Sequence, residues 1–103
     1  MATEIRVPQL RSYRIGEGEV IEVPLPVDTT YFEIEVMAKD TSVYWSMEAD
    51  QVDVENGHRR TLAGGAVFRL DNLRFDGNEV LYLSPPSGAA VIVEVVIAVR
   101  AIG

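Results

Sequence analysis

The sequence contains no cysteine, which excludes both a disulfide framework and a thiolate metal site. Basic residues are also few, because nine Lys and Arg face sixteen Asp and Glu, for a net charge of −7. Nucleic-acid binding needs a basic surface that releases counterions from phosphates, whereas here the arginines are scattered and Lys39 is the only lysine. We therefore expect no nucleic acid among the partners.

Histidine is almost absent as well, and His58 is the only residue that could supply the histidine base of a Ser or Cys triad. It lies between Gly57 and Arg59 beside a predicted turn, where a cross-strand or solvent-exposed role is the common one. Glu33 and Glu35 alternate along one predicted strand, and paired carboxylates can hydrolyse glycosides, but such a pair on an outer strand face is usually only solvated. We expect no catalytic residues, no cofactor and no enzymatic activity.

The longest apolar stretch closes the chain, where the fourteen residues Ala89–Ile102 carry only two charges, Glu94 and Arg100. A membrane-spanning helix needs about 20 apolar residues, and a glutamate near the middle would be costly in hydrocarbon. We therefore expect a buried strand and no membrane contact. The first six residues also lack the basic segment followed by an apolar stretch that a secretory signal needs.

Alternation of apolar and polar residues indicates strands along most of the chain. Phe32, Ile34 and Val36 share one face of residues 31–37, and Val43, Trp45 and Met47 share one face of residues 42–48. Asp40–Thr41 separates these two runs and predicts a hairpin between them. The same signals predict extended segments at residues 9–15, 19–23, 67–70 and 79–84.

Asn56–Gly57 is the strongest local turn signal, because both central residues of a tight hairpin need positive φ. A hairpin about this pair would place Glu55 opposite His58 and Asp53 opposite Arg60. Each cross-strand pair of opposite charge would contribute about 0.2–1 kcal/mol.

No segment repeats apolar residues with the spacing of a helix, and turn signals recur about every ten residues. These patterns predict an all-β fold, a single antiparallel β-sandwich or jelly-roll-like domain with little or no helix. We assign residues 1–26 to an extended N-terminal arm or edge strands, and residues 27–103 to the β-sandwich domain.

The last strand raises the question of a subunit contact. Its core face is apolar throughout and consists of Val91, Val93, Val95, Ile97 and Val99. The opposite face is half apolar and therefore needs a cover, either another part of the chain or a second subunit. The N-terminal residues form either an arm that adds to a neighbouring sheet edge or an ordinary edge hairpin. The residues predicted for a subunit or capsid interface are Ile5, Val7, Leu10, Tyr13, Ile92, Val96 and Ala98.

Two ligand hypotheses remain open. The oxygen-rich stretch Asp71–Glu79 could hold a cation, although its spacing does not fit an EF-hand loop and its residues also suit turns. Tyr31 and Tyr44 alternate with inward-facing aromatic residues, so they are predicted to face outward. There they could stack on a sugar or on another protein.

The segment Val43–Val99 resembles small virion proteins of tailed bacteriophages, of the head-decoration or cement type. The similarity lies in the stretches "VYWSMEADQVDVENG", "TLAGGAVFRL" and "EVLYLSPPSGAAVIVEVV". The resemblance implies a homo-oligomeric, often trimeric, β-sandwich that binds an assembled capsid and stabilises it.

The resemblance thus implies a structural virion protein, with the chain itself and a major capsid protein or other virion protein as partners. Its expected location is the capsid surface, and the host cytoplasm during assembly. The alternative is a carbohydrate- or receptor-binding module of a tail or adhesin.

Overall fold

The computed structural model describes residues 4–37, 40–55, 57–70, 78–86 and 90–102, with side chains described between Gln9 and Val99. These residues form strands and no helix, so they include no helix that could cross a membrane. The strands are β1 (Glu4–Ile15), β2 (Ile21–Pro24), β3 (Thr29–Val36), β4 (Ser42–Ser46), β5 (Arg60–Ala63), β6 (Val67–Leu70), β7 (Val80–Ser84) and β8 (Val91–Ile102).

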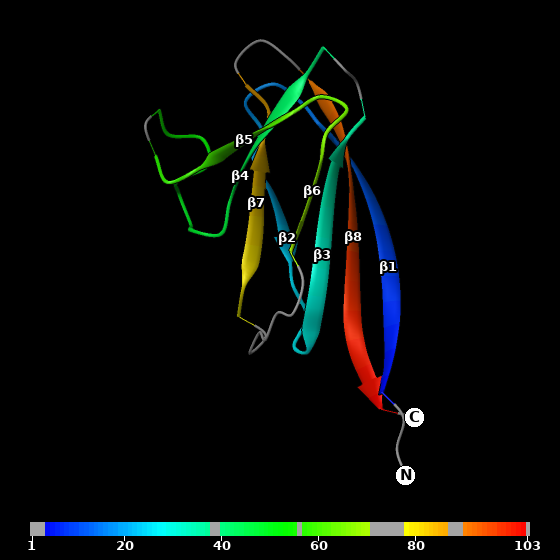
Figure 1. Ribbon diagram of the computed structural model, residues 1–103. Helices are drawn as coiled ribbons and strands as arrows, with labels where there is room; N and C mark the ends of the chain where they lie inside the picture. The colour runs from blue at the N-terminus through cyan, green and yellow to red at the C-terminus, as the bar shows by residue number, and fades with distance from the viewer. Residues whose placement is uncertain (1–3, 38–39, 56, 71–77, 87–89, 103) are drawn as a thin grey trace.

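The strands form two four-stranded antiparallel sheets packed face to face (Figure 1). Sheet A has the order β1-β8-β3-β6, and sheet B has the order β2-β7-β4-β5. The first strand pairs with the last, the second with the seventh, the third with the sixth and the fourth with the fifth. This nested pairing, rolled into two sheets, is a jelly roll, so the predicted fold class is confirmed.

Strand alternation builds the core as the sequence predicts. Phe32, Ile34 and Val36 on β3 are fully buried, while the residues between them are half-buried on the outer face. On β8 the predicted core face is buried from Val91 to Ile97. The rings of Trp45 and Phe68 lie 4.6 Å apart between centroids and pack against this core.

The predicted hairpin between residues 31–37 and 42–48 is wrong. These segments become β3 and β4, which lie in different sheets: β3 pairs with β8 and β6, and β4 pairs with β5 and β7. The chain therefore passes from one sheet to the other between β3 and β4, and each strand pairs with strands that are distant in sequence.

The hairpin predicted about Asn56–Gly57 is also wrong. Residues 51–55 form turns instead of a strand, and Arg60 lies opposite Trp45 at the start of β5, not opposite Asp53. Asn56 itself lies outside the described residues. The pairing of β4 with β5 places buried Val43 opposite buried Leu62, and this burial outweighs the small gain from surface charge pairs.

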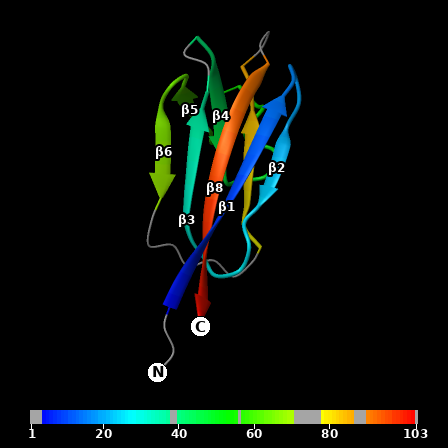
Figure 2. The same cartoon turned by 90° about the vertical axis from the view of Figure 1, so that its right-hand side faces the viewer.

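β1 and β8 make an unusually long antiparallel pair, in register from Glu4↔Ile102 to Ile15↔Val91. The pairing of β3 with β8 begins only at Thr29↔Val99, so the β1–β8 ribbon extends beyond the rest of sheet A. Both termini lie at this end of the molecule, which measures 53 × 25 × 17 Å (Figures 1 and 2).

Candidate functional site

An apolar stripe crosses the outer face of sheet A. Leu10 on β1 is 67% exposed and lies opposite Val96 of β8, whose side chain is half-buried. Ile92, farther along β8, is 48% exposed, and the neighbouring Met37 donates its backbone N–H to the Ile92 carbonyl at 3.1 Å. These four residues, which we call the apolar stripe, are the part of this face best suited to burial against another molecule.

One end of the apolar stripe is hollowed. The hollow has a volume of about 320 Å³, and its walls include Ile92, Met37 and Arg14. A side chain of a partner could enter here, which a flat strand face would not allow.

Charged groups flank the apolar stripe on the side of β3. Glu33 accepts a hydrogen bond from the Tyr31 hydroxyl at 2.7 Å and lies 3.4 Å from the guanidinium of Arg69. Glu35 stands directly opposite Glu94 across β3 and β8, and like charges in such positions repel. The outer face of sheet A therefore carries the apolar stripe on β1 and β8, with Glu94 between Ile92 and Val96, and is acidic along β3.

The other residues predicted for the interface are placed differently. Tyr13 packs against the core, on the side of β1 opposite to Leu10, so the two do not share a surface. Ala98 is buried. Ile5 and Val7 pair with Ala101 and Val99 through the backbone, and their side chains lie outside the described residues.

The connection between β4 and β5, residues 47–59, folds back over the outer face of sheet B. Ser46 ends β4 and anchors this loop: its hydroxyl donates to the His58 carbonyl at 2.7 Å and accepts from the Glu48 backbone N–H at 3.0 Å. The His58 ring lies 2.8 Å from the Glu48 carboxylate, with both side chains well exposed. His58 is thus part of a loop anchor at the surface.

Arg59 ties the same loop to the sheet. Its guanidinium lies 3.7 Å from the centroid of the Tyr44 ring and donates to the Val52 carbonyl at 3.0 Å. Val52 is 1% exposed although it belongs to a loop, so this contact closes over a buried side chain.

The two tyrosines proposed as a ligand platform do not act together. Tyr31 lies on β3 in sheet A and Tyr44 lies on β4 in sheet B, each on the outer face of its sheet. One face of Tyr44 is already occupied by Arg59. No single sugar or peptide could contact both rings.

Replacing Arg59 with alanine is expected to lower the free energy of unfolding by about 1–2 kcal/mol, because the cation–π contact and the hydrogen bond to Val52 are both lost. Chemical denaturation measures this change. Arg60→Ala is the matched control, since the neighbouring Arg60 is exposed and should change stability by less than about 0.5 kcal/mol. Equal losses for both variants would contradict the anchoring role of Arg59.

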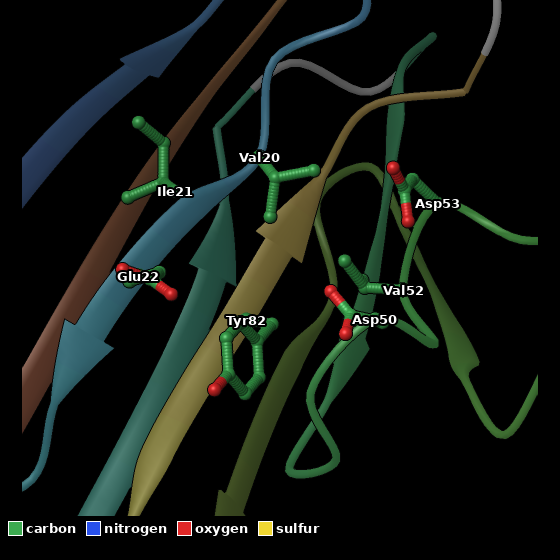
Figure 3. A pocket seen from close by; sticks show the side chains of 7 residues that line it. All are labelled: Val20, Ile21, Glu22, Asp50, Val52, Asp53 and Tyr82. Atoms are coloured by element: carbon green, nitrogen blue, oxygen red, sulfur yellow. The ribbon is translucent and has the colours of Figure 1, made fainter.

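A cleft opens between this loop and β2 (Figure 3). Its volume is about 460 Å³, and it is lined by Tyr82 of β7, Glu22 of β2 and, from the loop, Asp50 and Asp53. Asp50 has a φ of 63°, a left-handed conformation that aspartate tolerates and that turns the loop at this point. A second hollow of about 460 Å³ continues from Asp53 toward Tyr44 and Arg59.

The cleft combines an aromatic floor with acidic walls. Within the described part of the chain, no group of three or more His, Asp or Glu side chains is placed to hold a metal ion. Asp71, Asn72 and Asp76, from the cation hypothesis, lie outside the described residues. Chemically, the cleft could accept hydrogen bonds from hydroxyl or ammonium groups of a ligand resting on Tyr82.

Sequence reasoning did not find this cleft. Tyr82 appears in the sequence as one more residue of an alternating strand, and Val52 and Asp53 appear to continue an extended run. Only the fold brings β2, β7 and the loop together. The one available signal was the length of the β4–β5 connection, which the Asn56–Gly57 pattern concealed.

No family model and no curated protein sequence matches this chain. Two solved structures share its fold. One is the solution NMR structure of a de novo designed double-stranded β-helix, with a TM-score of 0.51 and 19% identity, covering 90% of this chain and 99% of the designed one.

The other belongs to Bacillus endospore appendages, which form a family of disulfide-linked pili. Its TM-score is 0.55 at 11% identity, covering 97% of this chain and 88% of the pilus chain. A structural neighbour is therefore a pilus-forming protein. At this identity the likeness concerns the fold, and a disulfide link is impossible here because this chain has no cysteine.

Proposed function

We propose that this chain is a structural protein that assembles with copies of itself, and that it decorates or cements the capsid of a tailed bacteriophage. The observation that carries self-assembly is the apolar stripe, where Leu10 on β1 and Ile92 on the adjacent strand β8 expose large apolar side chains on one face of sheet A. Burial of such side chains between subunits is the usual driving force of stable assembly.

One further finding agrees with a structural role, because a pilus-forming protein shares the fold. The step to a virion rests separately on the sequence resemblance of the segment Val43–Val99 to head-decoration proteins. The resemblance supplies the finer parts of the proposal: a trimer, a major capsid protein or other virion protein as partner, and a place on the capsid surface after assembly in the host cytoplasm. No catalytic step is assigned to the chain.

Ile92→Asp is expected to weaken self-association at least tenfold, because a charge replaces an apolar group whose burial is worth about 1.5–3 kcal/mol. Sedimentation velocity over a range of concentrations measures the change. Val54→Asp is the matched control: Val54 is 46% exposed, close to the 48% of Ile92, but lies in the β4–β5 loop. If both variants associate like the unmodified chain, assembly does not use the apolar stripe.

The virion role has its own test. Mass spectrometry of gradient-purified phage particles from the source of this sequence should find the chain in a fixed ratio to the major capsid protein. If the chain is recovered only outside the particles, the capsid role is wrong, whereas the proposed self-assembly is not contradicted.

The cleft beside Tyr82 favours a second candidate function, a carbohydrate- or receptor-binding module. Its acidic walls and aromatic floor are the kind of concave site in which a few polar groups orient a ligand. If the chain stays monomeric and binds a defined glycan on a glycan array, this candidate is favoured over the structural one.

A further inference from the structure

β1 is an outermost strand of sheet A, and the ladder fixes which of its backbone groups face outward. Met37 N–H donates to the Ile92 carbonyl and the Thr30 hydroxyl donates to the Ala98 carbonyl, so both of these β8 carbonyls point toward β3. In an antiparallel ladder, successive residues bond to alternate neighbours. Arg14, opposite Ile92, therefore directs its N–H and C=O away from β8.

The same holds for every second residue of β1, because its register with β8 continues without a shift. The outward positions are Glu4, Arg6, Pro8, Leu10, Ser12 and Arg14. Pro8 fits this assignment, since proline has no N–H and occupies edge positions that face away from the ladder. In the sheet order of the described residues no strand lies beyond β1, so Leu10, Ser12 and Arg14 offer a continuous edge for pairing.

We propose that β1 of a second copy of this chain pairs antiparallel with this edge, about a two-fold axis at Ser12. This inference rests on the proposed self-association and adds to the apolar stripe a second contact surface, the edge of β1, with a defined register. Ser12 would face Ser12 of the second copy, and Leu10 would face Arg14. The contact is isologous, because the same residues serve both copies, and it joins two copies of sheet A into one continuous sheet.

Hydrogen bonding and charge together favour this register over its neighbours. With the axis at Ser12, the bonded pairs within the strand are Ser12 with Ser12 and Leu10 with Arg14, and every member has both an N–H and a C=O. An axis at Leu10 would bring Pro8, which has no donor, into a bonded pair, and it would place Arg14 directly opposite Arg6. An axis at Tyr13 would leave only Ser12 and Arg14 bonded within the strand.

The charges select it as well. An axis at Arg11 would place two guanidinium groups directly opposite each other, which is destabilising. With the axis at Ser12, Arg11 instead lies opposite Tyr13 of the second copy, and Arg14 lies opposite Leu10, whose side chain is exposed. Each arginine nearest the axis therefore meets an uncharged residue.

The other sheet edges are poorer choices for the second copy. β2, β5 and β6 have four residues each, so alternation leaves at most two outward-facing residues on each strand. On β2 the outward residues include Pro24, which has no N–H to donate. Leu25 donates its N–H to the Glu79 carbonyl, so Leu25 faces β7, and the preceding residue Pro24 faces away from it. A two-fold contact gives an even number of copies, so this inference replaces the trimer that the resemblance favours.

The test uses the absence of cysteine. Ser12→Cys introduces the only thiol, and on the axis its Cα atoms would lie about 5.5 Å apart, within the range that a disulfide spans. We expect mild oxidation to convert most of the protein to a covalent dimer of twice the 11.4 kDa chain mass. Arg14→Cys is the control, because its Cα atoms would lie about 14 Å apart along the paired strands and should not cross-link.

A second variant tests the same pairing without changing residue 12, in case the substitution there prevents cross-linking by itself. The double substitution Leu10→Cys with Arg14→Cys places two thiol pairs in register and should also give the covalent dimer. If the unmodified chain is oligomeric but Ser12→Cys cross-links no faster than Arg14→Cys, the β1 pairing is wrong and the proposed self-association survives. If the unmodified chain is monomeric at every concentration, both the β1 pairing and the proposed self-association are wrong.

Discussion

Replacing Phe32 with alanine is expected to lower the free energy of unfolding by about 3–5 kcal/mol, a large part of the stability of a domain this size. Phe32 is fully buried at the centre of β3, opposite Ile97 of β8 on one side and Leu70 of β6 on the other. Its ring also lies 6.4 Å from that of Phe68. Loss of the ring leaves a cavity that strands paired on both sides cannot close.

Urea denaturation followed by the fluorescence of Trp45, the only tryptophan, measures this change. Leu10→Ala is the control, because Leu10 is largely exposed and its truncation should cost less than about 0.5 kcal/mol under conditions where the chain is monomeric. A loss below 1 kcal/mol for Phe32→Ala would mean that the core is not organised around this strand.

Val95→Thr is expected to lower the free energy of unfolding by about 1–3 kcal/mol. The two side chains have nearly the same shape, so the change creates no cavity and reports mainly the burial of a hydroxyl. Val95 is fully buried on β8, between Arg11 of β1 and Ile34 of β3 in the ladder.

Val96→Thr is the matched control one residue away. Its side chain is half-buried on the outer face of sheet A, where a hydroxyl can reach water, so stability should change by less than about 0.5 kcal/mol. Equal effects at the two positions, measured by urea denaturation at low protein concentration, would contradict the two-faced assignment of the last strand.

Strand positions could be predicted from the sequence where alternation is strong. β3 and β8 each place large apolar residues on one face, and a shift of one residue would turn Phe32 or Val95 out to water. The short strands β6 and β7 were found for the same reason. This information is local, because the face of the sheet on which a residue lies can be inferred from the polarity of the residues two positions away.

Strand partners could not be predicted in the same way. β3 and β4 are close in sequence yet enter different sheets, and β1 pairs with β8 at the far end of the chain. Asn56–Gly57 is a strong local turn signal, but the pairing of Val43 with Leu62 across β4 and β5 buries apolar surface that the local hairpin would leave exposed. Non-local burial decided the topology.

The same distinction between local and non-local information applies to the candidate surfaces. Leu10, Ile92 and Val96 were recognised because an apolar residue on the outer face of a strand is visible in the alternation itself. The cleft at Tyr82 was not, because its walls come from β2, β7 and the β4–β5 loop. Tyr13 was assigned to the interface, although its position on β1 places it on the core side.

The measurement that tests the central claim most directly is the solution mass of the intact chain by sedimentation equilibrium over a wide concentration range. Deleting the N-terminal residues would not serve, because β1 is a strand of sheet A paired along its whole length with β8. The structural proposal predicts a concentration-dependent mass that reaches at least twice 11.4 kDa. A mass of 11.4 kDa at every concentration would contradict it and direct attention to the cleft beside Tyr82.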